Sequence, residues 1–304
     1  MNWKTKVAVQ FILSKFQHGE SLNHRLQLMG GRYTPQILQD KILWRLPVYD
    51  QIKLHVSLKD ASVVEVGTGW ELLDPLLMFI FRSREIYTYD HVRHLRFSIP
   101  RQIILQLHAI KDLLISRGGD PERIDALHRV NSLDELLALA GIHYVAPGDA
   151  CATGLLEKSV DLFFSISVLE HVPPDVLTKL IAESRRILKP SGMGFHIIDP
   201  GDHYAELGVS KVNFLQYSDR IWDFFVQNKI SYHNRLRARQ FIEAFEGQGA
   251  KLESVKTRID QSDIERLRSG LKVARRFSGF TPEELAAHYC EIMHSFAHEG
   301  RAVA

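Results

Sequence analysis

The chain has 304 residues, of which 45% are hydrophobic and 24% charged, and its formal net charge is +2. This composition is ordinary for a globular protein, and the length allows one large α/β domain with additions or two small domains. The charge is too mild to predict nucleic-acid binding, which normally shows as a strong, clustered basic excess. We interpret the basic cluster Arg235-Leu-Arg237-Ala-Arg239 as a solvated helix face.

The two cysteines, Cys151 and Cys290, are far apart and follow neither a CxxC nor a Cys/His spacing. This predicts neither a disulfide framework nor a structural zinc site, and it favours a reducing, cytoplasmic location. The N-terminal stretch has lysines among its apolar residues and no small-residue cleavage site, so it is a poor signal peptide. The longest apolar run, residues 76–81, is far below the ~20 residues of a membrane-spanning helix, so we expect no membrane span.

Residues 1–60 lack strand-like runs and are expected to form a helical N-terminal extension. Apolar residues such as Val7 and Phe11 recur at helical spacing in this region. The glycine pair Gly30-Gly31 is expected to break the helical pattern.

Strand and helix patterns alternate from about residue 61 onward, so residues 61–304 are expected to form one α/β domain with a doubly wound, mostly parallel sheet. Residues 189–192, Lys-Pro-Ser-Gly, are expected to close the helix that precedes the fifth strand. Residues 288–296 could either continue a helix or form a last antiparallel strand. The other expected strands are residues 62–66, 85–89, 143–146, 160–166, 193–198 and 251–256.

Two stretches, at about residues 95–142 and 200–239, are longer than the connections that a sheet needs. In the first, Ser132-Leu-Asp-Glu135 is a capping box that predicts a helix, and Gly141 suits the end of that helix. Both stretches follow the carboxyl ends of strands, where ligands bind in open α/β sheets. We therefore expect both to be helical insertions that form a lid over a substrate. Thr281-Pro-Glu-Glu284 predicts a further helix start.

The segment Glu65-Val-Gly67-Thr68-Gly69 directly follows the first expected strand. Glycines in such a turn allow positive φ and let a ligand approach the backbone. A dinucleotide site would place a third glycine at position 72, which is Leu72 here. A carboxylate two residues before the first glycine can instead accept a hydrogen bond from the ammonium group of an amino-acid moiety. The turn therefore favours S-adenosylmethionine over NAD.

Further polar residues follow the next strands. Asp90 ends the second strand, where a carboxylate reaches ribose hydroxyls. Asp149 and Ala150 follow the third strand, where a carboxylate and backbone N–H groups can meet an adenine ring. Ser165 lies near the end of the fourth strand, whose edge is expected to line the floor of the cofactor site.

In combination, these segments, with Ser167-Val-Leu-Glu-His-Val172 and Ile187-Leu-Lys-Pro-Ser-Gly192, resemble the successive motifs of class I S-adenosylmethionine-dependent methyltransferases. The resemblance covers about residues 60–256. It implies a Rossmann-like, seven-stranded sheet with one reversed strand at the edge, and S-adenosyl-L-methionine as cofactor. By position it assigns the methionine moiety to Glu65, Gly67 and Gly69, the ribose to Asp90, the adenine to Asp149 and Ala150, with Thr68 and Ser165 as neighbours.

Methyl transfer is an in-line displacement, for which an oxygen or nitrogen acceptor can require a base. Histidines near the strand ends are the candidates: His203 and His233 lie in the second insertion, and His171 follows the fourth strand. Asp199, Asp202 and His203 could also bind a divalent metal, but we interpret the aspartates as loop caps and assign no metal ligand.

The acceptor is predicted to be a small molecule, with O-methylation preferred because histidine bases serve a hydroxyl. Two alternatives stay open: an NAD(P)-binding oxidoreductase, and a non-catalytic nucleoside-binding member of the fold. Besides the acceptor, a second copy of the chain, as a homodimer, is a possible partner. The sequence does not reveal which molecule receives the methyl group.

Overall fold

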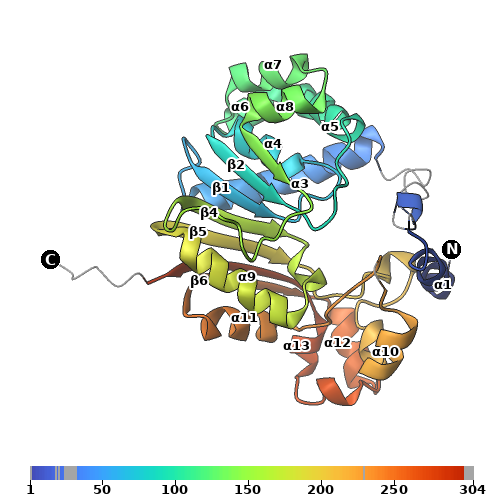
Figure 1. Ribbon diagram of the computed structural model, residues 1–304. Helices are drawn as coiled ribbons and strands as arrows, with labels where there is room; N and C mark the ends of the chain where they lie inside the picture. Colours follow the sequence, from blue (N-terminus) through green and yellow to red (C-terminus); the bar gives the residue numbers. More distant parts are fainter. Residues whose placement is uncertain (1, 18, 20, 24–32, 229, 298–304) are drawn as a thin grey trace.

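The computed structural model describes residues 2–17, 19, 21–23, 33–228 and 230–297. Within these residues seven strands form one mixed sheet in the order β3-β2-β1-β4-β5-β7-β6 (Figure 1). The β7 strand is antiparallel to both of its neighbours, and the other pairs are parallel. The predicted doubly wound, mostly parallel sheet is therefore confirmed. The reversed strand, however, lies inside the sheet between β5 and β6, not at its edge.

The strands are β1 (Ser62–Val66), β2 (Glu85–Tyr89), β3 (Ile142–Val145), β4 (Val160–Ile166), β5 (Leu188–Ile198), β6 (Ala250–Ile259) and β7 (Ala287–Phe296). The helices are α1 (Trp3–Leu13), α3 (Pro35–Lys53), α4 (Leu73–Ile80), α5 (Ser98–Ala109), α6 (Lys111–Ser116), α7 (Pro121–Arg129), α8 (Leu133–Ala140), α9 (Pro174–Ile187), α10 (Asp219–Phe225), α11 (Ala238–Gly247), α12 (Gln261–Arg268) and α13 (Pro282–Ala286). None of these described helices is both long and apolar enough to cross a membrane. The expected break at Gly30-Gly31 lies outside the described residues.

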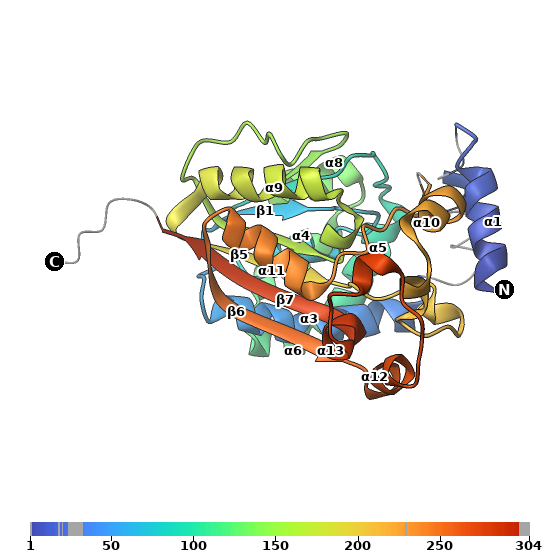
Figure 2. The same cartoon turned by 90° about the horizontal axis from the view of Figure 1, so that it is seen from below.

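The central strands are buried on both faces. In β1, Val63 belongs to the core on one face of the sheet, and its neighbour Val64 belongs to the core on the other. Successive side chains of a strand point to opposite faces, so a continuous apolar run such as that of β1 suits a sheet covered on both sides. Helices α9 and α11 cover one face, and α3 and α4 cover the other (Figures 1 and 2).

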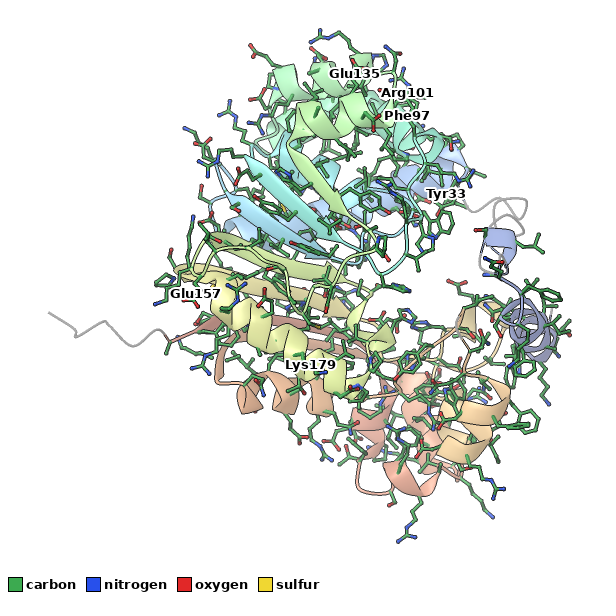
Figure 3. The ribbon with its side chains drawn as sticks, in the orientation of Figure 1. Tyr33, Phe97, Arg101, Glu135, Glu157 and Lys179 are labelled. Carbon is green, nitrogen blue, oxygen red and sulfur yellow. The ribbon has the colours of Figure 1, made fainter. Side chains whose placement is uncertain are left out.

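The first insertion does not form the expected lid. Its helices α5, α7 and α8 contribute buried residues to the same core as α3 and α4. Arg101 of α5 donates a hydrogen bond to the carbonyl of His128 in α7 at 2.7 Å (Figure 3). The amphipathic pattern of these helices has its apolar side in the main core, so they add a second helical layer and do not cover the carboxyl ends of the strands.

Two predictions concern the C-terminal half of the sheet. One is wrong, and for the other the structure decides between two alternatives. Residues 189–192 do not close a helix: they belong to β5, which starts at Leu188 and pairs with Val160 before the register shifts to Leu162 and Met193. For residues 288–296 the antiparallel alternative is confirmed, because they lie in β7.

The predicted helix boundaries are confirmed. The Ser132 side chain accepts a hydrogen bond from the backbone N–H of Glu135 at 3.1 Å, and α8 ends at Gly141 with a φ of +60°. Thr281 and Glu284 form a reciprocal capping box at the start of α13. Capping side chains satisfy the backbone N–H groups that a helix start leaves without partners.

The second insertion forms a separate small core together with α1. Val7 of α1 is buried with Phe214 and Trp222. The Tyr204 hydroxyl donates to Oε1 of Gln10 at 3.0 Å. The first and last thirds of the chain therefore meet beside the carboxyl ends of β4 and β5 (Figure 1).

The basic cluster before α11 is buried, which contradicts its interpretation as a solvated helix face. Arg235 and Arg237 are both 0% exposed, whereas Arg239 lies at the surface. Arg237 donates to the carbonyl of Pro200 at 2.5 Å and to that of Ala287 at 2.6 Å. Burial lowers the pKa of Arg237 to about 9, so its guanidinium stays charged at neutral pH.

Candidate active site

The glycine turn after β1 lies between the ends of β2 and β4. The N–H of Gly67 donates to the carbonyl of Tyr89 at 2.8 Å. Gly67 has a φ of +87°, and a Cβ built on it would lie 2.3 Å from Cγ2 of Val168. Gly69 has a φ of +60°, and a Cβ there would have no atom within 4 Å. The turn is therefore packed on its Val168 side and open at Gly69.

Asp90 is joined directly to this turn. Its Oδ2 accepts a hydrogen bond from the N–H of Gly69 at 2.8 Å. Burial alone would raise the pKa of Asp90, but hydrogen bonds from His91 and from the backbone of Gly69 and Val92 outweigh it and lower the pKa. The carboxylate is therefore ionised at neutral pH and accepts hydrogen bonds at the end of β2.

The loop that carries Asp149 and Ala150 lies beside Asp90. The N–H of Gly148 donates to the Asp90 carbonyl at 2.8 Å, which ties the loop to the end of β2. Oδ1 of Asp149 accepts from the N–H of Cys151 at 2.8 Å, and the Asp149 side chain is otherwise exposed. Ala150 is half-buried. The structure thus brings Gly67, Gly69, Asp90 and this loop to one edge of the sheet.

Glu65 and Thr68 lie beneath the turn and not on its open side. The Glu65 carboxylate is 5% exposed and accepts a hydrogen bond from the Thr88 hydroxyl, which also pairs with the Thr68 hydroxyl at 2.5 Å. Burial, and secondarily the charge of Asp74, raise the pKa of Glu65 well above its ordinary value. In this arrangement Glu65 braces β1 against β2.

Ser165 is separated from the other predicted cofactor residues. It is 0% exposed, and its hydroxyl pairs with Nδ1 of His196 in β5 at 2.8 Å. The next serine in the chain, Ser167, is exposed at the end of β4. Ser165 lies within β4, whereas Ser167 lies beyond its last residue, Ile166, so a shift of two residues along the chain moves the hydroxyl from the core to the end of the sheet.

A pocket of about 780 Å³ lies at the carboxyl ends of β4 and β5. It adjoins the glycine turn: Lys41 of its wall forms an ion pair with Glu71 at 2.5 Å, two residues after Gly69. Acidic and basic side chains both line it, as expected for a site that takes a polar ligand. The lining is Lys41, Trp44, Arg45, Ser167, Glu170, His171, Asp199, Gly201, Asp202, His203, Ala205, Glu206, Lys211 and His288.

The three histidines predicted from the sequence lie close together: His171 and His203 line this pocket, and His233 is buried behind them and lines a neighbouring smaller pocket. The ring centroids of His171 and His203 are 4.9 Å apart, and those of His203 and His233 are 4.6 Å apart. His171 follows β4, while His203 and His233 come from the second insertion. The structure therefore brings together residues that the sequence separates by more than one element.

The hydrogen bonds of two of these histidines define which nitrogen carries the proton. Nδ1 of His171 lies 2.6 Å from the Tyr232 carbonyl, which can only accept, so Nδ1 is protonated and Nε2 keeps a lone pair. Nδ1 of His233 accepts from the N–H of Arg235 at 3.0 Å, so its neutral ring carries the proton on Nε2. His171 is thus arranged to accept a proton or bind a cation, and His233 to donate.

Comparison with known proteins bears on what this edge of the sheet is for. A family model of methyltransferase domains matches residues 122–195, from α7 through β3 and β4 into β5. The sheet has the seven strands and the one reversed strand that the motif resemblance implied, although the reversed β7 lies inside the sheet and not at its edge. Over residues 122–195 the chain is therefore similar to methyltransferase domains, and its motifs resemble those of class I S-adenosylmethionine-dependent methyltransferases.

Two solved structures illustrate what the chain is similar to. The PH0226 protein of Pyrococcus horikoshii OT3 is 15% identical with a TM-score of 0.44, over 87% of this chain and 94% of that one. The geranyl diphosphate C-methyltransferase of Streptomyces coelicolor A3(2) is 14% identical with a TM-score of 0.44, over 82% of this chain and 77% of that one. No curated protein sequence matches the chain.

Glu170 is a pocket residue that the sequence interpretation did not predict. Glu170 is 0% exposed, and neither of its carboxylate oxygens has a hydrogen-bond partner. Burial raises the pKa of Glu170 well above its ordinary value. In the sequence, Glu170 and His171 follow the fourth strand as a pair, but only His171 was predicted to be a site residue. Lys41 and Arg45 could not be found this way, because α3 lies far upstream of the motifs.

Proposed function

We propose that this methyltransferase transfers the methyl group of S-adenosyl-L-methionine to a hydroxyl group of a small molecule. The observation that carries the proposal is the Asp90 carboxylate, which is ionised and bonded to the open Gly69 turn. A carboxylate that ends the second strand beside a glycine turn suits ribose hydroxyls.

The remaining predicted cofactor residues fit around Asp90 in the proposed complex. The methionine moiety lies on the turn of Gly67 and Gly69, and the adenine lies against Asp149 and Ala150. Glu65 and Thr68 support the turn from below, so Glu65 acts on the ammonium group of the cofactor through water or after leaving Thr88. Ser165 supports β4 from the core.

The acceptor occupies the pocket next to the turn. Its hydroxyl oxygen attacks the methyl carbon, the bond from that carbon to sulfur breaks, and the electron pair of the bond stays on the sulfur of S-adenosylhomocysteine. The hydroxyl proton passes to a base, for which Nε2 of His171 has the free lone pair. His203 orients the acceptor beside it, and the buried His233 packs against the His203 ring.

The two cysteines support the proposed cytoplasmic location. Cys151 and Cys290 are both free thiols, which suits a reducing compartment. A homodimer remains a prediction.

Calorimetric titration with S-adenosylhomocysteine tests the cofactor site. We expect the wild type to bind and Asp90→Ala to bind about ten- to a hundredfold more weakly, because hydrogen bonds to a charged group contribute about 1.5–3 kcal/mol. Asp134→Ala, which removes an exposed carboxylate on α8, is the control and should bind as the wild type does. No binding by the wild type would overturn the proposal.

Radiolabelled methyl transfer into a metabolite extract tests the reaction itself. Label in a small-molecule fraction that resists the mild alkali that hydrolyses methyl esters is expected for an ether product. Tight cofactor binding without transfer to any acceptor would instead favour the non-catalytic alternative.

A further inference from the structure

Glu170, His171 and His203 place three metal-binding groups at one end of the acceptor pocket. One ligand atom from each residue lies within 4.8 Å of the ligand atoms of the other two. We propose that these three side chains bind a divalent transition-metal ion. This goes beyond the sequence expectation, which assigned no metal ligand and considered only Asp199 and Asp202 beside His203.

The first argument is the state of Glu170. A buried carboxylate without any hydrogen-bond partner is costly, whether it is ionised or loses the hydrogen bonds that its protonated form made with water. Both oxygens of Glu170 are in this position, while the residue lines the pocket beside the two histidines. A bound cation supplies the missing partner and compensates the buried charge.

The second argument is the orientation of His171. Histidine ligands of metals typically donate their other ring N–H to a carboxylate or a backbone carbonyl, which fixes the ring and the tautomer. Nδ1 of His171 does this with the Tyr232 carbonyl at 2.6 Å, and Nε2 is left free. The Tyr232 carbonyl thus accepts the hydrogen bond that typically orients a metal-binding imidazole.

The donor set selects the kind of ion. Two imidazoles and one carboxylate suit Zn²⁺, Fe²⁺ or Co²⁺, whereas Mg²⁺ and Ca²⁺ prefer oxygen ligands only. Ligands at about 2.1 Å from one ion lie about 3–4 Å apart, so binding draws the three groups inward by about 1 Å. His203 lies in a half-buried segment after β5, which can make this adjustment.

The role of the ion rests on the proposed function. Three protein ligands leave at least one coordination position open, as in catalytic zinc sites. In that position the acceptor hydroxyl would bind the cation, which lowers the pKa of the hydroxyl and holds its oxygen in line with the methyl group. Because Nε2 of His171 would then be bound to the ion, it would no longer serve as the base, and the hydroxyl proton would leave to solvent before transfer.

Binding of Zn²⁺ and Co²⁺ to chelator-treated full-length protein tests the site without any methyl transfer. We expect one equivalent of Zn²⁺ by calorimetry, and visible d–d absorption when Co²⁺ is bound. We expect Glu170→Gln and His203→Gln to weaken binding about a hundredfold or more, since even the loss of outer-shell partners costs about 10–100-fold. His288→Gln is the matched control, because His288 lines the same pocket outside the trio.

Thermal unfolding separates a metal ligand from a merely structural residue. The metal-free Glu170→Gln variant should be about as stable as the metal-free wild type, because it replaces a buried carboxyl without partners by an amide of the same shape that is also without partners. Added Zn²⁺ should raise the Tm of the wild type and not that of the variant.

The outcomes are distinguishable from those for the cofactor. Failure of the wild type to bind Zn²⁺ and Co²⁺, or equal binding by Glu170→Gln and His288→Gln, would overturn the metal site. If S-adenosylhomocysteine still binds, the proposed function stands without it. If the metal binds but S-adenosylhomocysteine does not, the metal site stands and the proposed function fails.

Discussion

Gly67 and Gly69 both have positive φ, but only Gly67 approaches another side chain closely. An alanine at Gly69 meets no atom of the protein, so it costs only the left-handed backbone conformation, about 1–2 kcal/mol. An alanine at Gly67 also collides with Val168, which adds about 1–3 kcal/mol. The open space above Gly69 is where the proposed cofactor would approach.

We therefore expect Gly69→Ala to lose cofactor binding while keeping most of its stability, and Gly67→Ala to lose both. Gly118→Ala is the control, since Gly118 also has a positive φ (+89°) with no atom near a built Cβ, but lies far from the turn. Urea unfolding and titration with S-adenosylhomocysteine check this. Equal affinities of Gly69→Ala and Gly118→Ala would contradict the placement of the cofactor on the turn.

The sequence predicts the surroundings of a residue well when its contacts come from neighbouring strands, and poorly when they come from segments far away in the chain. Asp90 and the glycine turn follow consecutive strands of a parallel sheet, so their proximity follows from the strand pattern alone. Glu170 is different, because its lack of partners arises from the way in which distant segments close over it. The burial of Ser165 depends on which face of β4 it takes, and the motif does not state this.

At the scale of elements, Arg237 joins three segments that are far apart in the chain. Its side chain connects the N-terminus of α11 with the carbonyls of Pro200, after β5, and Ala287, at the start of β7. A fully buried guanidinium in this position holds the second insertion against the sheet. The prediction of a solvated helix face was wrong because the sequence shows the charge of an arginine-rich segment but does not show which distant carbonyl groups will bind it.

We expect Arg237→Met to lower the free energy of unfolding by about 2–5 kcal/mol, because two buried carbonyls lose their donor at about 1–3 kcal/mol each. Arg239→Met is the matched control: Arg239 is 43% exposed and pairs with Glu284, and such surface pairs contribute at most about 1 kcal/mol. The difference in urea midpoints measures the effect. Similar midpoints for the two variants would show that the buried contacts of Arg237 contribute little.

At the scale of the whole molecule, stability should depend on pH through two core histidines. His196 and His294 are 1% and 0% exposed, and their Nε2 atoms lie 3.3 Å apart between β5 and β7. Burial lowers the pKa of His294 from 6.5 to about 3, and burial together with His294 lowers that of His196 well below its ordinary value. Both rings are therefore neutral in the folded protein at neutral pH.

Unfolding exposes these rings, so the unfolded chain binds more protons once the pH falls below 6.5. Each ring then costs about 1.4 kcal/mol of stability per pH unit, from pH 6.5 down towards its folded-state pKa. We expect the urea midpoint of the wild type to fall from pH 7 to pH 5. In His294→Gln the free energy of unfolding should depend less steeply on pH, by about 1.4 kcal/mol per pH unit, because one fewer proton is taken up on unfolding. His55→Gln, at an exposed site, is the control. Equal slopes for His294→Gln and the wild type would contradict this assignment.

The position of β7 has a consequence for how the protein is made. A ribosome delivers β5 and β6 well before β7, yet β7 lies between them in the sheet. Until residues 287–296 have emerged, β5 has an unpaired edge, β6 has no neighbour, and the guanidinium of Arg237 lacks one of its two carbonyls. Unpaired edges invite association with other chains. The nascent protein thus depends on β7, which begins 50 residues after the buried arginine, to pair the inner edges of β5 and β6.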